Sequence, residues 1–157
     1  MSAWVELLRW VHVVGACVLL GTGAGIAFFM LMAHHTRNPA VVAHVANSVV
    51  AADMLFTATA VVVQPLTGAL LAQVTGWSLA TPWILLSIAL YVLTGLLWLP
   101  VVLIQLRIRN LAREAVAKGT PLDQQYERQF RIWFLLGGPA FASVLAILWL
   151  MVARPAL

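Results

Sequence analysis

The sequence contains few charged residues, and this scarcity is its most restrictive property. Only 9% of the 157 residues are Asp, Glu, Lys or Arg, whereas 63% are hydrophobic. Ordinary soluble domains carry about 25% charged residues, because charge keeps their surfaces in water. A chain of this size with so few charged residues cannot form the polar surface that a soluble domain needs. The composition therefore excludes a soluble globular protein and favours a membrane protein.

Cysteine and lysine are almost absent. The single cysteine, Cys17, excludes an internal disulfide, and without a C-x-x-C-H motif a covalently attached c-type haem is excluded as well. The single lysine is Lys118. The sequence also lacks H-E-x-x-H, P-loop, G-x-S-x-G and EF-hand patterns, so nothing in it favours a hydrolase or a nucleotide-driven machine.

Long apolar runs fill nearly all of the chain. A helix needs about 20 apolar residues to cross a hydrocarbon layer about 30 Å thick, and four runs exceed that length. They predict an all-α fold, a four-helix transmembrane bundle, in a single domain spanning 1–157. The first run is too long for a signal-peptide core, so we expect a retained transmembrane helix. The predicted helices are 4–32, 41–74, 82–113 and 128–153.

Proline lies inside three of these four helices, at Pro65, Pro100 and Pro139. Each proline removes a backbone hydrogen bond, so the pattern predicts Pro-kinked helices. In lipid the freed carbonyl groups need other donors. Gln64, Thr67 and Trp98 are close enough in sequence to the first two prolines to be expected as those donors.

The basic residues are concentrated in one connection. Six of the nine lie in or beside the segment 107–131, whereas the connection around 74–81 carries no charge. By the positive-inside rule the basic connection is cytoplasmic, so the N-terminus and C-terminus are expected outside. We predict a multi-pass protein of a bacterial inner membrane. The lipid bilayer is its expected partner, and we expect no binding of nucleic acid.

An aromatic belt is expected at the outer interface. It would be formed by Trp4, Trp10, Trp77 and Trp83.

Ionisable side chains within the spans are functional candidates, because they are costly to place in lipid. Glu6, Arg9 and His12 follow one another at helical spacing in the first span. Asp53 is the only carboxylate in the middle of any predicted helix. Counting residues inward from the span ends places His12 and Asp53 at similar depth. They are expected either to form a buried polar pair, Asp53 with His12, Arg9 or a hydroxyl, or to relay protons.

His12 is also a candidate haem ligand, because imidazole binds iron and a porphyrin needs a flat apolar slot. Gly15 and Ala16 follow one turn later and leave little side chain beside the imidazole. Met54 is the nearest candidate for a second axial ligand, with Gln64 and water left open. Met30, His34 and His35 offer ligands for copper(I), but they are also typical of an interfacial helix end. The expected cofactor-binding residues are His12, Gly15, Met54, Gln64 and Trp98, with His12 as the metal ligand.

Several segments resemble a family of predicted bacterial integral membrane proteins of unknown function. The resemblance covers essentially the whole chain, and its most specific parts are Gln64-Pro65-Leu66-Thr67-Gly68 and Leu97-Trp98-Leu99-Pro100. More remotely, Trp10-Val-His12-Val-Val-Gly15 is similar to copper-resistance protein D and to HemJ-type protoporphyrinogen oxidases. Those relatives imply a haem or metal near His12. The HemJ type also uses a membrane lysine, which this chain lacks.

Three functional hypotheses follow from the sequence. The first is a membrane protein that binds haem b at His12 and serves a redox or haem-handling role. Its protein partner is left open between a membrane redox protein and a second copy of the same chain. The alternative is a non-enzymatic membrane subunit or small transporter with a polar path around Asp53. A third reading assigns the polar residues to packing alone. The sequence does not decide whether the protein is an enzyme.

Overall fold

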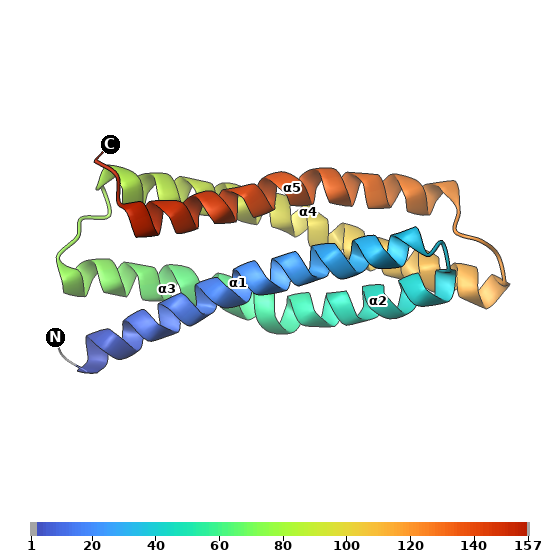
Figure 1. Cartoon of the computed structure of the whole chain (residues 1–157), viewed down its shortest axis with the longest axis horizontal. Coiled ribbons are helices and arrows are strands. Elements are labelled where there is room, and N and C mark those ends of the chain that lie inside the picture. The colour runs from blue at the N-terminus through green and yellow to red at the C-terminus, as the bar shows by residue number, and fades with distance from the viewer. Residues whose placement is uncertain (1–2, 157) are drawn as a thin grey trace.

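The computed structural model of the chain describes residues 3–156 and contains helices only in that range. Five α-helices and one π-helical turn form four long rods (Figure 1). The elements are α1 (Ala3–His35), α2 (Pro39–Ala52), the π-helical turn η1 (Asp53–Thr57), α3 (Ala58–Thr75), α4 (Pro82–Lys118) and α5 (Gln124–Ala153). Because α2, η1 and α3 form one continuous rod, the predicted four-helix bundle is confirmed.

Each of the four rods is long and apolar enough to cross a bilayer. Large hydrophobic side chains such as Trp10, Phe29, Leu55 and Leu96 are exposed on the outside of the bundle, where a soluble protein would carry polar groups. The chain is therefore a multi-pass membrane protein whose outer surface contacts lipid.

The helix ends follow local sequence signals. Asn38 and Asp123 cap α2 and α5 by accepting hydrogen bonds from the backbone N–H groups of Ala40 and Tyr126. Gly76 and Gly119 end α3 and α4 in the left-handed conformation, at φ 76° and 64°, which glycine adopts without strain. Pro65, Pro100 and Pro139 lie inside α3, α4 and α5, which continue through them. The helices extend up to five residues beyond the predicted ends.

The two ends of the bundle differ in charge. Both chain termini lie at one end, together with the α3–α4 connection; we call it the terminal end (Figure 1). The α1–α2 and α4–α5 connections lie at the opposite end, which we call the basic end. Its basic residues are Arg37, Arg107, Arg109, Arg113, Lys118, Arg128 and Arg131.

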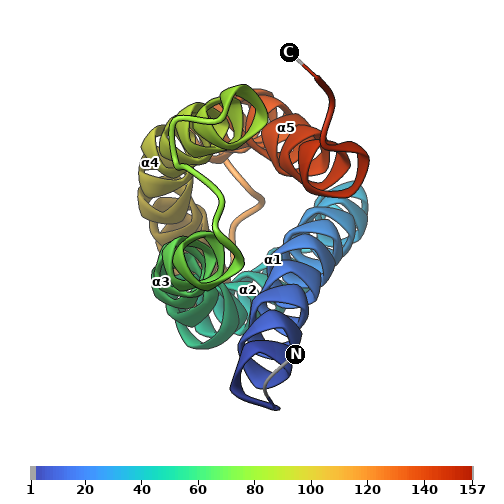
Figure 2. The same ribbon diagram turned by 90° about the vertical axis from the view of Figure 1, so that its left-hand side faces the viewer.

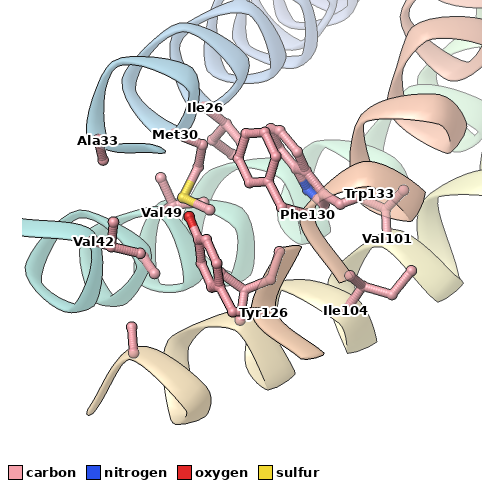
Figure 3. Close-up of a cluster of buried hydrophobic side chains, with 13 residues drawn as sticks. Ile26, Met30, Ala33, Val42, Val49, Val101, Ile104, Tyr126, Phe130 and Trp133 are labelled. Carbon is pink, nitrogen blue, oxygen red and sulfur yellow. The ribbon is translucent and has the colours of Figure 1, made fainter. Parts of the chain in front are cut away.

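The main hydrophobic core occupies the half of the bundle toward the basic end. Buried side chains from α1, α2, α4 and α5 meet there around Met30, Ile104, Tyr126 and Phe130 (Figure 3). Toward the terminal end the rods separate into two pairs, because α3 packs mainly on α1 while α4 packs mainly on α5. The view along the bundle shows the four rods arranged around a central space (Figure 2).

The expected aromatic belt is only partly formed. Trp4 and Trp10 are exposed near the terminal end, as an interfacial belt requires. Trp83 is instead buried with Ile84 and Leu150 in a small second core, and it packs in a T-shaped arrangement with Trp77, with ring centroids 5.5 Å apart. Trp83 therefore holds α4 against α5 rather than anchoring the protein at the interface.

Candidate functional site

A cavity of about 320 Å³ lies where the two helix pairs separate. Its volume is at the lower end of the range of small-molecule sites, about 300–1,000 Å³. Glycines keep its walls open, because a side chain at those positions would project into the space. The lining residues discussed below are Gly23, Asp53, Thr57, Gln64, Tyr91, Gly95, Trp98, Gln105, Trp133, Phe134, Gly137, Gly138 and Phe141.

Asp53 is the centre of a hydrogen-bonded network on the cavity wall. Its side chain is only 2% exposed. Trp98 Nε1 donates to Asp53 Oδ1 at 3.3 Å. When the Gln105 amide is oriented to satisfy both of its neighbours, Nε2 donates to Asp53 Oδ2 at 2.9 Å and Oε1 accepts from Trp133 Nε1 at 3.2 Å. The network thus joins the central turn of the second rod to α4 and α5.

The network begins at the π-helical turn η1. Asp53 and Thr57 stand at its two ends, and both side chains are buried and line the cavity. Thr57 is 8% exposed, and its hydroxyl lies near the Asp53 carboxylate without forming a hydrogen bond of good geometry within residues 3–156. π-Helical turns inside α-helices are rare and occur frequently at functional sites. Sequence patterns did not reveal this turn.

The carbonyl group freed by Pro65 has a donor that the sequence analysis missed. Proline at this position cannot bond to the carbonyl of Val61, four residues earlier. The Tyr91 hydroxyl, from α4, donates to that Val61 oxygen. The expected donors have other partners: Gln64 bonds to α1, Thr67 to its own helix, and Trp98 to Asp53. The expected donor to the Val61 carbonyl was wrong, because Tyr91 lies 30 residues farther along the chain and on another helix. Proximity in sequence does not reveal such a donor.

His12 is fixed against α3 by Thr67. The two side chains are joined by a hydrogen bond of 2.8 Å between Nδ1 and Oγ1. Thr67 Oγ1 also lies 2.8 Å from the Val63 carbonyl oxygen, to which its hydroxyl can donate. With the hydroxyl proton directed to Val63, Thr67 accepts from His12 Nδ1, and this assignment of the tautomer leaves the imidazole lone pair on Nε2. A Cβ at Gly68 would lie 3.2 Å from the imidazole, so a larger residue there would push the ring a few tenths of an ångström away from α3.

Gln64 fills the space beside Gly15. Its Nε2 donates to the His12 backbone carbonyl at 2.7 Å. A Cβ at Gly15 would collide with the same Gln64 nitrogen. Gly15 therefore allows α3 to pack closely on α1. The space beside Gly15, which was expected to suit a porphyrin, is occupied by the Gln64 side-chain amide.

His12 and Asp53 lie at different depths, so Asp53 does not pair with His12, and the polar groups beside its carboxylate include the Thr57 hydroxyl. His12 is level with Thr67, which is 14 residues from Asp53 along one continuous rod, or about 21 Å. Arg9 is three residues nearer the terminal end and therefore farther still from Asp53. The depth comparison was wrong because these helices are longer than the hydrocarbon layer, so counting from their ends does not fix depth.

The remaining predicted site residues separate into two groups. Gln64 and Trp98 line the cavity, as expected for pocket residues. Met54 is 46% exposed on the outer surface of the rod and is not brought together with His12.

His12 lies on the same face of α1 as the residues of that helix that line the cavity. Helical spacing relates it to Ala16, Leu19 and Gly23, so His12 extends this cavity-facing stripe by one turn toward the terminal end.

The histidines near the basic end have structural contacts. The His34 ring stacks on Phe130, with centroids 3.8 Å apart, and its Nδ1 is 3.1 Å from the Tyr126 hydroxyl. Glu127 pairs with Arg37 beside it. Within residues 3–156 no group of three His, Cys, Asp or Glu side chains is placed to hold a metal ion. These contacts give His34 a structural role, because they pack the end of α1 against α5.

Together, the four apolar rods, the lipid-facing surface and the interhelical cavity define a four-span integral membrane protein. Residues 6–155 match the family described as "Predicted integral membrane protein (DUF2269)", and the chain belongs to this family. The family resemblance noted from the sequence is confirmed, and the family's function is unknown. No curated protein and no solved structure matches the chain.

Proposed function

We propose that this protein binds a small, largely apolar ligand in the interhelical cavity, as a small transporter or a ligand-binding membrane subunit. This corresponds to the alternative drawn from the sequence, a polar path around Asp53. We place it in a bacterial inner membrane with the basic end in the cytoplasm, as the positive-inside rule predicts.

One observation carries the proposal: a cavity of ligand size has a buried polar network on its wall. Apolar pockets with a few converging polar groups are the usual form of small-molecule sites. Asp53 and Gln105, both buried, lie in the cavity wall where it borders the main hydrophobic core. A group as costly to place in a membrane as a carboxylate is expected to mark a functional site.

The first prediction concerns what co-purifies with the protein. Gly95 and Gly137 line the cavity, and a Cβ at either position would meet no atom within 4 Å. The double substitution Gly95→Leu/Gly137→Leu is therefore expected to fill the cavity without a backbone clash. Wild-type protein should release a small molecule in about equal molar amount on denaturation, and the filled variant at least ten-fold less. Mass spectrometry of solvent extracts measures both.

Gly21→Leu is the matched control. Gly21 also has open space around it but does not line the cavity. Its extract should equal that of the wild type, including the lipids that bind the outer surface. If the filled variant and the control released the same molecules in the same amounts, the cavity would not be the binding site.

A second candidate is binding of haem b through His12, favoured by the bonding of its imidazole. Axial histidines are typically oriented by a hydrogen bond at the other ring nitrogen, and Thr67 is placed to accept such a bond from Nδ1 in the tautomer that keeps the lone pair on Nε2. The fit is limited to this one ligand: no His, Met or Cys lines the cavity within the described part of the chain. A bound haem would supply one-electron redox chemistry, and His12 is the residue that would hold it.

Haem binding predicts a Soret band in protein purified from haem-sufficient cells. His12→Ala is expected to remove the band, because it removes the imidazole that would bind the haem iron. His34→Ala and His35→Ala are the matched histidine controls and should keep the full band, since these residues lie at the basic end. Absorption spectra of the purified variants decide the matter. Wild-type protein without a Soret band, or a His12→Ala variant that keeps it, would contradict haem ligation by His12.

A further inference from the structure

The carboxylate of Asp53 faces the cavity with neutral partners. It accepts hydrogen bonds from Trp98 and Gln105, and neither side chain carries a charge. No Lys, Arg or His side chain lines the cavity between residues 3 and 156. A carboxylate in an apolar site is strongly destabilised unless a positive charge accompanies it. The ionised form of Asp53 thus needs a counter-ion, and the described lining residues do not supply one.

The same carboxylate retains unused bonding capacity. A carboxylate has about four lone-pair positions, and the two observed donors occupy one on each oxygen. The nearby Thr57 hydroxyl adds a further polar group without a well-formed bond among the described residues. A ligand group in the cavity can therefore reach Asp53 without breaking the network to α4 and α5.

Aromatic rings surround the rest of the space. Tyr91, Trp98, Trp133, Phe134 and Phe141 line the cavity from α4 and α5. The faces of such rings carry partial negative charge and attract cations, most strongly when water is excluded. They also provide a wide apolar surface. Aromatic walls and one carboxylate are complementary to a molecule that is apolar in most of its surface and positive at one point.

We propose that the cavity binds a lipophilic monovalent cation, an apolar and preferably aromatic body carrying one positive charge, with Asp53 as its counter-ion. The inference rests on the proposed function, since it names the ligand class of the same cavity. The charge lies beside the Asp53 carboxylate, and the apolar body occupies the space between the aromatic residues of α4 and α5 and the small residues of α1.

Tetraphenylphosphonium, a monovalent lipophilic cation, is the probe, and uncharged triphenylphosphine oxide is its neutral counterpart. Isothermal titration of the full chain in detergent measures the dissociation constants. We expect saturable binding of the cation at one site per chain, at least ten-fold tighter than that of the neutral probe. Asp53→Asn should weaken cation binding at least ten-fold and change binding of the neutral probe less than two-fold. Gly95→Leu/Gly137→Leu should abolish binding of both probes.

Glu114→Gln is the matched control for removal of a carboxylate, because Glu114 is exposed beyond the span and paired with Lys118. It should bind both probes as the wild type does. Size-exclusion elution and circular dichroism establish that each variant is folded. If Asp53→Asn does not fold, the comparison of the two probes on the wild type and on Asp53→Glu, which keeps the charge, decides the matter.

The outcomes separate the two proposals. Equal affinity for the two probes, or an unchanged cation affinity in folded Asp53→Asn, would overturn the cation assignment. The cavity proposal would survive that result if the co-purified molecule still depended on Gly95 and Gly137. Loss of that dependence would instead overturn the cavity proposal, whatever the probes showed.

Discussion

Gly15→Leu is expected to destabilise the bundle by about 3 kcal/mol, because the new side chain would occupy the space of the Gln64 amide. Gln64 is buried between α1 and α3, and its donation to the His12 carbonyl would be lost as well. For a chain of this length, a loss of that size lowers the melting temperature by roughly 6–12 °C. Thermal unfolding in detergent, followed by the helical circular dichroism signal, measures the effect.

Gly21→Leu is again the matched control. Both substitutions raise the helix propensity of α1 by a similar amount, so the difference between them isolates the contact with Gln64. A Cβ at Gly21 would meet no atom within 4 Å, so Gly21→Leu should leave the melting temperature unchanged or slightly higher. Similar melting temperatures for the two variants would show that α3 does not pack against Gly15 in the way described.

Tyr91→Phe is expected to cost about 1–3 kcal/mol, because it removes the donor to the carbonyl group that Pro65 leaves free. The effect depends on that proline. In a Pro65→Ala background the backbone N–H of residue 65 can bond to Val61, so the same Tyr91→Phe change should cost less than about 0.5 kcal/mol. Unfolding free energies of the four proteins, measured together, give the coupling between the two sites.

The double-mutant comparison contains its own control, because Tyr91→Phe removes the same hydroxyl group in both backgrounds. Any contribution of that hydroxyl to the cavity cancels between the two measurements. An equal cost in the presence and absence of Pro65 would mean that Tyr91 stabilises the protein by some route other than the Val61 carbonyl.

The architecture could be read from local sequence signals. Four apolar runs predict four membrane-spanning helices because the bilayer sets the minimum length of a span. Gly119 ends α4 because its left-handed conformation needs no particular neighbour. The burial of Asp53 and Gln64 could be predicted too, because lipid cannot satisfy a polar side chain. These properties depend on the chain and its solvent, and not on how the helices pack together.

The partners of those buried groups could not be predicted in the same way. Asp53 was expected beside His12, Arg9 or a hydroxyl, and the structure bonds it to Trp98 and Gln105. Pro65 was expected to find a donor nearby in sequence, and the donor is Tyr91. In each case the contact depends on the rotation and vertical offset of one helix relative to another.

The sequence by itself determined the membrane solvent, the four spans and the set of residues that had to be kept from lipid. The tertiary structure alone decided that Asp53, Trp98, Gln105 and Trp133 form one network on a cavity wall, while His12 is held by Thr67 about 21 Å away. The physical reason is that helices longer than the hydrocarbon layer can shift along one another at little cost in solvation. Interhelical packing, such as that of Gln64 against Gly15, fixes their offset and thereby the site.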